Sequence, residues 1–319
     1  MNPYVFIVGC PRSGTTLLQR MVDAHPHIAI IFETHWIPRW FEKRRGVTPE
    51  GCVTPELVDK LLKDRRFKKN LRIGRKDLDR LISSSEPVSY SSFVTGFFDL
   101  HGQAQSKPLV GDKTPAYVRR IPTLHALFPK ARFVHIIRDG RDVCQSITNW
   151  RKADEAAGRF ATWEEDPVST TALWWKWNVT LGREDGAPLG SDLYHEVRYE
   201  ALVSEPAQEC EKLCSFLDLP YDDAMLRYHE GRERPKPGRS AKNAWLRVTP
   251  GLRDWRTQMC TGDVERFEAA AGDLLEELGY ERAVPNPSSR ALEHAARIRD
   301  LFIRDACTQG QRLPESWQG

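Results

Sequence analysis

The 319-residue sequence lacks an apolar run near the roughly 20 residues that a membrane-spanning helix needs. It also lacks an excess of charge of one sign, and a net charge of +3 is too small to indicate a nucleic-acid-binding protein. Its seven cysteines are odd in number and scattered, without a CxxC pair. This pattern favours a reduced, cytoplasmic protein without structural metal. We expect no signal peptide, because the first strand begins near Tyr4.

The chain is organised around the stretch VFIVGCPRSGTTLLQRMVDAH, at residues 5–25. Its first four residues form an apolar run without alternation, which is typical of a strand covered on both faces. The end of the stretch predicts an amphipathic helix, with Gln19 and Arg20 off its apolar face. Between strand and helix, Gly9 and Gly14 permit a tight turn. Backbone N–H groups and the positive end of the helix then form an anion cradle.

The spacing of this turn matches a phosphate-binding loop, except that Thr15 stands where the lysine should be. That lysine neutralises the β- and γ-phosphates of a nucleoside triphosphate, so the cradle here suits a single phosphate. Arg12 supplies a cation inside the loop. We therefore expect Arg12, Ser13, Gly14, Thr15 and Thr16 to bind an anion. An ordinary strand-to-helix turn is the weaker alternative.

A second stretch, ARFVHIIRDGRDVCQSITNW at residues 131–150, again predicts a strand, a turn and a helix. Arg138 leaves the carboxyl end of the strand, and Ser146 follows eight residues later in the helix. An arginine and a serine hydroxyl can meet the same phosphate from these two positions. Arg141 is left out of the site, because it suits an ion pair at the start of the helix.

Together these residues resemble a known family. PRSGTTLLQRMVDAHP is similar to the 5′-phosphosulfate-binding loop of sulfotransferases that use 3′-phosphoadenosine 5′-phosphosulfate (PAPS). The run through HPHIAIIFETHWIP is most similar to the tyrosylprotein and related Golgi-type branch. Arg138 and Ser146 resemble the family's 3′-phosphate site, which discriminates PAPS from ATP. The Golgi relatives carry a membrane anchor and a stem, and we expect neither here.

Glu33 follows a second apolar stretch, IAIIF, and we expect it at the carboxyl end of a strand, where open α/β sheets bind ligands. Without the resemblance, Glu33 would read as a surface residue that caps the next turn. In the tyrosylprotein branch the glutamate in this place is the catalytic base. His35 and His25 are rival bases, and either could equally be a structural or surface histidine.

Lys113 lies in KPLVGDKTPAY, residues 107–117, which predicts a short buried strand and a turn. It too emerges at a strand's carboxyl end, although it could be a surface lysine beside a helix. The resemblance implies that Lys113 faces the transferring sulfuryl group. Lys113, Arg12 and the loop N–H groups would then stabilise charge on the leaving phosphate.

Later motifs complete the resemblance less closely. Tyr199 stands in a YE-x-L-x-x-x-P element, in which the family's tyrosine contacts the adenine. A late loop closes the family's nucleotide site and leads into a helix with tryptophan, a place that Trp255 fits. Ser240 and Arg247 are the weaker candidates for this loop, because the spacing departs from the family's.

The resemblance implies an α/β fold of the P-loop-like, three-layer kind, with a central parallel sheet flanked by helices. We expect one domain over residues 1–285 with a helical insertion at about 40–106. A tail helix over residues 286–319 could bury against the domain or form homodimer contacts.

The predicted function is transfer of the sulfuryl group from PAPS to an acceptor hydroxyl, with Glu33 as general base, 3′-phosphoadenosine 5′-phosphate (PAP) as product and no metal. The acceptor could be a tyrosine or other phenol, a carbohydrate or a small-molecule alcohol. We expect the protein to bind no nucleic acid and to have no membrane-spanning segment. Two alternatives stay open: a P-loop kinase or NTPase, and a non-catalytic nucleotide-binding protein.

Overall fold

A sheet of five parallel strands forms the centre of the protein, in the order β2-β3-β1-β4-β5. The computed structural model describes residues 4–65, 67, 73–83, 86–230, 246–249 and 254–317. The strands are β1 (Val5–Gly9), β2 (Ile28–Phe32), β3 (Leu109–Lys113), β4 (Arg132–Ile137) and β5 (Tyr194–Arg198). The chain builds β2 and β3 on one side of β1 and then β4 and β5 on the other. The strand order therefore reverses at β1, which is where open α/β sheets bind ligands.

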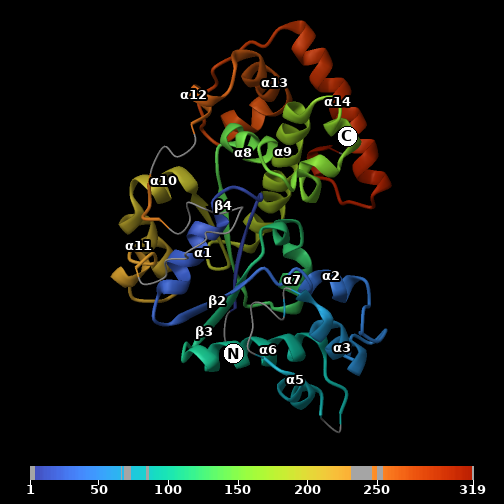
Figure 1. Cartoon of the computed structure of the whole chain (residues 1–319), viewed down its shortest axis with the longest axis vertical. Helices are drawn as coiled ribbons and strands as arrows, with labels where there is room; N and C mark the ends of the chain where they lie inside the picture. Colours follow the sequence, from blue (N-terminus) through green and yellow to red (C-terminus); the bar gives the residue numbers. More distant parts are fainter. Residues whose placement is uncertain are drawn as a thin grey trace.

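Helices cover both faces of this sheet (Figure 1). Helices α6 and α7 share a core with one face, α1 and α11 share a core with the other, and α8, α9, α13 and α14 form a further layer. Their bounds are α1 (Thr15–Ala24), α2 (Ile37–Glu42), α3 (Pro55–Lys63), α5 (Arg75–Ile82), α6 (Tyr90–Gln105), α7 (Ile121–Leu127), α8 (Gly140–Thr148), α9 (Pro167–Gly186), α10 (Tyr199–Ser204), α11 (Pro206–Phe216), α12 (Trp255–Gln258), α13 (Thr261–Glu277) and α14 (Ser289–Thr308). The expected three-layer α/β fold is confirmed.

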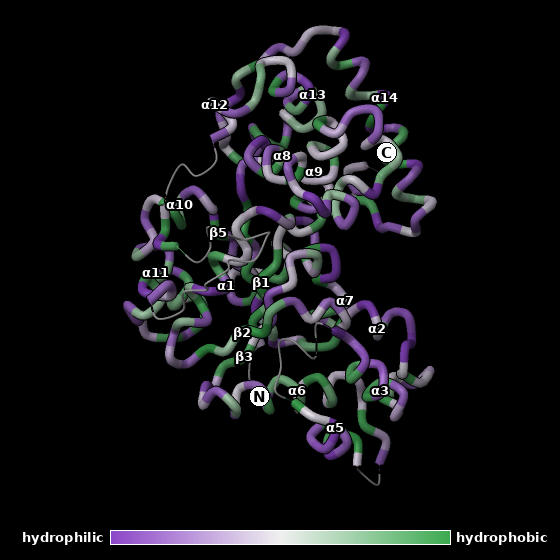
Figure 2. The backbone as a smooth tube through the Cα atoms, viewed as in Figure 1, coloured by the Kyte–Doolittle hydropathy of each residue, from purple (hydrophilic) through white to green (hydrophobic). Residues whose placement is uncertain are grey.

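Alternate residues of β1 point to opposite faces of the sheet, as the pleat of a strand requires. Phe6 and Val8 belong to the core that includes Phe98 of α6, whereas Val5 and Ile7 belong to the core beneath α1. Hydrophobic residues gather on the central strands in Figure 2. Burial on both faces explains why the strand sequence is a continuous apolar run without alternation.

Helix α1 departs from the amphipathic pattern expected of it. Gln19 and Arg20 are buried, at 7% and 6% exposure, and do not face solvent as predicted. The reason is that α1 contacts β2 on one side and the 3₁₀ turn η6 (Asp223–Met225) on the other. A second layer of chain therefore covers the polar face of the helix.

The segment predicted as a helical insertion, residues 40–106, contributes to the main core. Phe93 and Phe97 of α6 are fully buried in the cluster that contains strand residues of the sheet. In the tail, α14 buries Ile298 and Phe302 in the cluster that contains α9 and α13. The boundary between domain and tail at residue 285 stays a prediction. Across the described residues, no helix combines the length and the apolar character needed to cross a membrane.

Candidate active site

The loop between β1 and α1 wraps around the amino end of α1. Gly9, Arg12 and Gly14 all have positive φ, at 155°, 78° and 92°. The Ser13 N–H donates to the Cys10 carbonyl over 3.1 Å, which tightens the turn. Gly14 is the N-cap of α1, and no side chain caps the helix there. The amides of the first turn therefore suit an anion.

Gly14 also lets another part of the chain approach the loop. A Cβ atom at Gly14 would lie 2.3 Å from the ring of Tyr199, closer than any side chain allows. A Cβ at Gly9 would lie 2.5 Å from the carbonyl oxygen of Ile136 on β4. Both glycines of the sequence motif are therefore required by contacts with distant segments as well as by the turn.

The surroundings of Ser13 are a separate observation that fits a phosphate group bound at the loop. Ser13 is fully buried, and its Oγ has no hydrogen-bond partner among the described residues. A buried hydroxyl of this kind indicates a missing partner, such as a phosphate oxygen. Thr15 is also buried, and Thr16 follows it in the first turn of α1.

Arg12 and Ser146, which the sequence assigned to different phosphates, meet directly. The Arg12 Nε donates to Ser146 Oγ over 2.8 Å, and the guanidinium carbon lies 5.3 Å from the centroid of the Trp150 ring. Ser146 lies on α8 and is 3% exposed. Arg12 therefore points toward the proposed 3′-phosphate helix.

Arg138 lies directly after β4, on the far side of the loop from β3. One of its terminal nitrogens donates to Asp142 Oδ2 over 2.8 Å, and its guanidinium carbon lies 4.1 Å from the centroid of the Tyr199 ring. Its Nε is buried without a partner among the described residues. Trp175 Nε1 donates to the Arg138 carbonyl over 3.1 Å and so holds its backbone. The unpaired Nε fits a phosphate oxygen as a charge-assisted donor.

Asp142 is a site residue that the sequence reasoning missed. Its Oδ1 accepts the backbone N–H of Trp255 over 2.9 Å, while Oδ2 accepts from Arg138. Burial raises the pKa of Asp142, and Arg138 opposes that effect. The i, i+4 spacing of Arg138 and Asp142 was the signal available in the sequence. Asp142 thus joins the arginine to the start of α12.

Arg141, left out of the site, is indeed occupied elsewhere. Its guanidinium donates to Asp139 Oδ2 over 2.7 Å and to Glu268 Oε1 over 2.6 Å, and it lies 3.7 Å from the centroid of the Trp255 ring. These contacts bind the start of α8 to α13. Arg141 therefore has a structural role.

Glu33 and Lys113 form a close ion pair where β2 and β3 end. Lys113 Nζ lies 2.6 Å from Glu33 Oε1 and 3.4 Å from Thr16 Oγ1. The lysine is completely buried, and its Nζ lies 3.8 Å from the centroid of the Phe32 ring. Lys113 therefore links the carboxylate to the first turn of α1, and so to the phosphate loop.

The ion pair fixes the charge of Glu33. Burial disfavours the carboxylate, but Lys113 and His35 outweigh burial and lower the pKa of Glu33 to about 2. Burial lowers the pKa of Lys113, although Glu33 works in the opposite direction. Glu33 is accordingly ionised and can accept a proton at neutral pH.

Asp112 holds the turn that carries Glu33, through a hydrogen bond to the backbone of that turn. Glu33 and His35 both have positive φ, at 51° and 57°. Between them, the Thr34 N–H donates to Asp112 Oδ2 over 3.1 Å, and Thr34 Oγ1 lies 2.7 Å from the Tyr117 hydroxyl. Burial raises the pKa of Asp112 to about 6. Sequence reasoning missed Asp112 because a carboxylate inside a strand carries no motif of its own.

The two rival histidines have different surroundings. His35 Nε2 lies 3.1 Å from Glu33 Oε2, so His35 belongs to the site. His25 is fully buried, with Nε2 bonded to the Pro220 carbonyl over 2.9 Å and Nδ1 accepting the His27 N–H over 3.1 Å. Both ring nitrogens of His25 are therefore occupied by structural bonds.

The late loop is only partly described. Ser240 lies outside the described residues. Arg247 is exposed, and the Tyr228 hydroxyl donates to the carbonyl of neighbouring Leu246 over 2.5 Å. The assignment of Ser240 and Arg247 to the nucleotide site stays a prediction.

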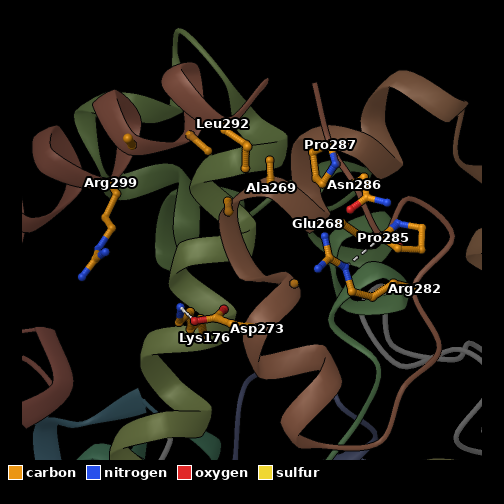
Figure 3. Close-up of a pocket in the computed structure, with 14 residues that line it drawn as sticks. Lys176, Glu268, Ala269, Asp273, Arg282, Pro285, Asn286, Pro287, Leu292 and Arg299 are labelled. Carbon is orange, nitrogen blue, oxygen red and sulfur yellow. Dashed lines mark hydrogen bonds and ion pairs between the residues drawn. The ribbon is translucent and has the colours of Figure 1, made fainter. Parts of the chain in front are cut away.

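A cleft of about 500 Å³ lies away from this site, among α9, α13, α14 and the chain before α14 (Figure 3). Two ion pairs line it, Lys176 with Asp273 and Arg282 with Glu268. None of the predicted site residues lines this cleft. The cleft is therefore separate from the chemistry at the ends of the strands.

Comparison with known proteins settles the family. The profile of the family described as Sulfotransferase family matches residues 3–223. The chain belongs to the sulfotransferase family. The resemblance found in the two phosphate motifs is thereby confirmed.

Curated relatives of this sulfotransferase include a protein-tyrosine sulfotransferase of Drosophila melanogaster. It is 29% identical over 288 residues, which cover 88% of this chain and 52% of that protein. Human protein-tyrosine sulfotransferase 1 is 27% identical over 310 residues, which cover 93% of this chain and 76% of that one. The chain thus spans about half the length of the Drosophila relative.

Among solved structures, the sulfotransferase domain of a Synechococcus olefin synthase superposes with a TM-score of 0.60 at 22% identity. The match covers 88% of this chain and 95% of that domain. A sulfotransferase domain from the curacin biosynthetic pathway gives a TM-score of 0.51 at 18% identity. These likenesses support the fold.

Proposed function

We propose that this sulfotransferase transfers the sulfuryl group of PAPS to the hydroxyl of a tyrosine side chain. The observation that carries the proposal is the Glu33–Lys113 pair, with Nζ and Oε1 2.6 Å apart, beside a phosphate loop that has Thr15 in place of the nucleotide-binding lysine. Tyrosine is the first acceptor to test because the relatives named above are protein-tyrosine sulfotransferases. A carbohydrate or a small-molecule alcohol is the alternative acceptor.

The donor supplies a sulfuryl group on a 5′-phosphate, and the residues of this chain fit its two ends. The loop amides and Ser13 would hold the 5′-phosphate, while Arg138, Ser146 and Arg12 would hold the 3′-phosphate. Tyr199 would contact the adenine, and its ring position against Gly14 and Arg138 supports this assignment. Two fixed phosphate sites orient the donor without further flexibility.

At the reacting end, Glu33 would accept the proton of the acceptor hydroxyl, because its carboxylate is ionised and has both oxygens at the strand ends. Lys113 would stabilise charge on the leaving phosphate oxygen and leave Glu33 as it does so. This exchange also frees the carboxylate from its closest cation. Glu33 would then become more basic at the moment when it takes the proton.

The first experiment is a thermal-shift and calorimetric titration with PAP, ADP and ATP–Mg²⁺. A ligand at about 100 times its dissociation constant adds roughly 2.7 kcal/mol to the free energy of unfolding. We expect PAP to bind without metal and ADP hardly to bind. Binding of ATP–Mg²⁺ but not of PAP would instead favour a kinase or NTPase.

Transfer is tested next with ³⁵S-labelled PAPS and tyrosine peptides, with phenylalanine peptides as the matched control. Label in the tyrosine peptide alone supports the proposal. PAP binding without transfer to a tyrosine, carbohydrate or phenol would indicate a non-catalytic nucleotide-binding protein.

The proposals on location and assembly rest on separate observations. All seven cysteines are free, including the two exposed ones, Cys260 and Cys307, and this supports a reducing compartment such as the cytoplasm. A homodimer through the tail stays a prediction.

A further inference from the structure

The two carboxylate oxygens of Glu33 have different neighbours. Oε1 lies 2.6 Å from Lys113 Nζ, inside the protein, where the lysine side chain is 0% exposed. Oε2 lies 3.1 Å from His35 Nε2, and the side chains of His35 and Glu33 are 25% and 27% exposed. One oxygen therefore faces a buried cation, and the other faces an imidazole in contact with solvent.

On the buried side, the neighbour of the carboxylate is Lys113. Lys113 is completely buried and already carries a proton in its pair with Glu33. A carboxylate that has taken the acceptor proton must release it before the next turnover. His35, in contact with both Oε2 and solvent, lies on the open side of the carboxylate.

A strained backbone conformation holds His35 in this position. Glu33 and His35 both adopt left-handed conformations, at φ 51° and 57°, which non-glycine residues rarely adopt. Thr34 between them is fixed by Asp112 and Tyr117. Such strain persists only where the surrounding contacts determine it, and it gathers at functional sites.

We propose that His35 positions the Glu33 carboxylate and relays its proton to solvent during sulfuryl transfer. The proposal rests on the function proposed above. The acceptor O–H bond breaks as its oxygen bonds to sulfur, and the S–O bond to the 5′-phosphate breaks with its electron pair leaving on the phosphate. Glu33 takes the proton and passes it to Nε2 of the neutral imidazole in the tautomer that carries its hydrogen on Nδ1. The imidazolium then loses the Nδ1 proton to water, and exchange with water restores the Nδ1–H tautomer. His35 is a positioning residue, because it acts through Glu33.

The relay predicts where turnover fails on acidification. A protonated imidazole cannot accept a further proton, whereas the Glu33 carboxylate, with a pKa of about 2, stays ionised on mild acidification. The charged groups that face His35 are Glu33 on its own turn and Asp112 on β3, with Lys113 beyond Glu33. Because burial raises the pKa of Asp112 to about 6, the Asp112→Asn variant is needed to assign the acidic limb of the profile.

The test compares His35→Gln and His35→Ala with the control His27→Gln, which alters an exposed histidine on the same side of the chain. We expect both His35 variants to lose about 10²-fold in kcat, with the acceptor KM and the affinity for PAP unchanged. The acidic limb of the kcat profile should vanish in His35→Gln and persist in Asp112→Asn. Added imidazole should restore turnover in His35→Ala.

Three results would overturn the relay: a full kcat in His35→Gln, an acidic limb that persists in it, or no response of His35→Ala to imidazole. A further measurement, which does not depend on enzyme activity, accompanies these assays. The ¹⁵N shifts of the His35 ring should show its Nε2–Oε2 bond and should change in Glu33→Gln. Unchanged ring shifts in that variant would contradict the contact itself.

The outcomes separate the two proposals. If the wild-type protein binds PAP and transfers sulfate while His35→Gln matches it, the relay alone fails. If the wild-type protein does not bind PAP, the proposed function fails, and the relay fails with it whatever the ring shifts show.

Discussion

Glu33 combines a low pKa with a role that calls for a base. Lys113 and His35 both stabilise the carboxylate, so in the resting protein it is a weak proton acceptor. Moving Lys113 toward the leaving phosphate would weaken that stabilisation only when the donor is present. Under the proposed mechanism, the Glu33 carboxylate would become a stronger base only when the substrates are in place, so the chemistry would depend on positioning.

The prediction for Glu33→Gln is a loss of turnover with the donor site intact. The amide keeps the size of the side chain but cannot take a proton, so kcat should fall by about 10²- to 10⁴-fold while PAP affinity is unchanged. Sulfate-transfer assays and calorimetry check the two quantities. Glu50→Gln, at an exposed position, is the control. An equal loss of PAP affinity would show that Glu33 is structural.

The prediction for Arg138→Ala is the reverse. Loss of a charge-assisted hydrogen bond to the 3′-phosphate costs about 1.5–3 kcal/mol, so PAP should bind roughly 10- to 100-fold more weakly. The affinity for a nucleotide without a 3′-phosphate should not change. Calorimetry with PAP and ADP makes the comparison. Unchanged PAP affinity would remove Arg138 from the 3′-phosphate site.

We expect Asp142, which accepts a hydrogen bond from Arg138, to compete with the proposed 3′-phosphate for that arginine. The Asp142→Asn variant keeps an oxygen for the Trp255 N–H but removes the negative charge 2.8 Å from the arginine. PAP should therefore bind about tenfold more tightly, a gain of roughly 1.4 kcal/mol. Asp154→Asn, an exposed position, controls for the change in net charge. Weaker binding would mean that Asp142 orients Arg138 and does not compete for it.

At the scale of elements, the strand–loop–helix units are assembled by contacts between them. Gly14 of the first unit accommodates the Tyr199 ring, and the same ring lies over Arg138 of the second unit. Tyr199 is the first residue of α10, directly after β5. The segments that follow β1, β4 and β5 therefore meet at one aromatic ring, between the two proposed phosphate sites.

Gly14→Ala tests this assembly. A Cβ would meet the Tyr199 ring at 2.3 Å and would strain a residue at φ 92°. Gly279→Ala is the control, because Gly279, just after α13, has φ 75° and none of the described atoms lies within 4 Å of the added Cβ. Strain alone costs about 1–2 kcal/mol, so Gly279→Ala should lose that much stability and Gly14→Ala clearly more. Urea denaturation measures the stability of both variants. Equal losses would show that the Tyr199 ring moves aside to accommodate the added Cβ.

Periodicity predicted the elements well where a strand is buried on both faces. The apolar runs before Gly9 and before Arg138 are strands β1 and β4, and the family match covers both. The helix pattern failed at Gln19 and Arg20, because the segment around η6 covers their face and periodicity cannot foresee a second layer. Asp112 and Asp142 were missed for a similar reason, since each acts by a bond to a residue distant in sequence.

At the scale of the whole molecule, the candidate site lies at the strand ends, and helices α8, α9, α13 and α14 share a core beside it. Arg141 ties the start of α8 to Glu268 of α13, and Glu268 also accepts the N–H groups of Ala283 and Val284, at 3.1 and 2.8 Å. Helix α8, which carries Ser146 of the proposed 3′-phosphate site, is thereby connected to α13 and to the chain before α14. That connection is structural, and the cleft in Figure 3 lies beyond it.

The stability of the protein should depend on pH in two opposite ways that both originate at the site. The pKa of Glu33 is about 2 in the folded protein, below its ordinary value of 4.5, so its contribution is present above pH 4.5 and is lost as the pH falls toward 2. The pKa of Asp112 is about 6 in the folded protein, above its ordinary 3.8, so stability falls as the pH rises from about 4 to 6. Urea denaturation across pH 2–8 should show a rise followed by a decline. Glu33→Gln should flatten the rise and Asp112→Asn the decline, whereas a decline that persists in Asp112→Asn would assign it to other groups.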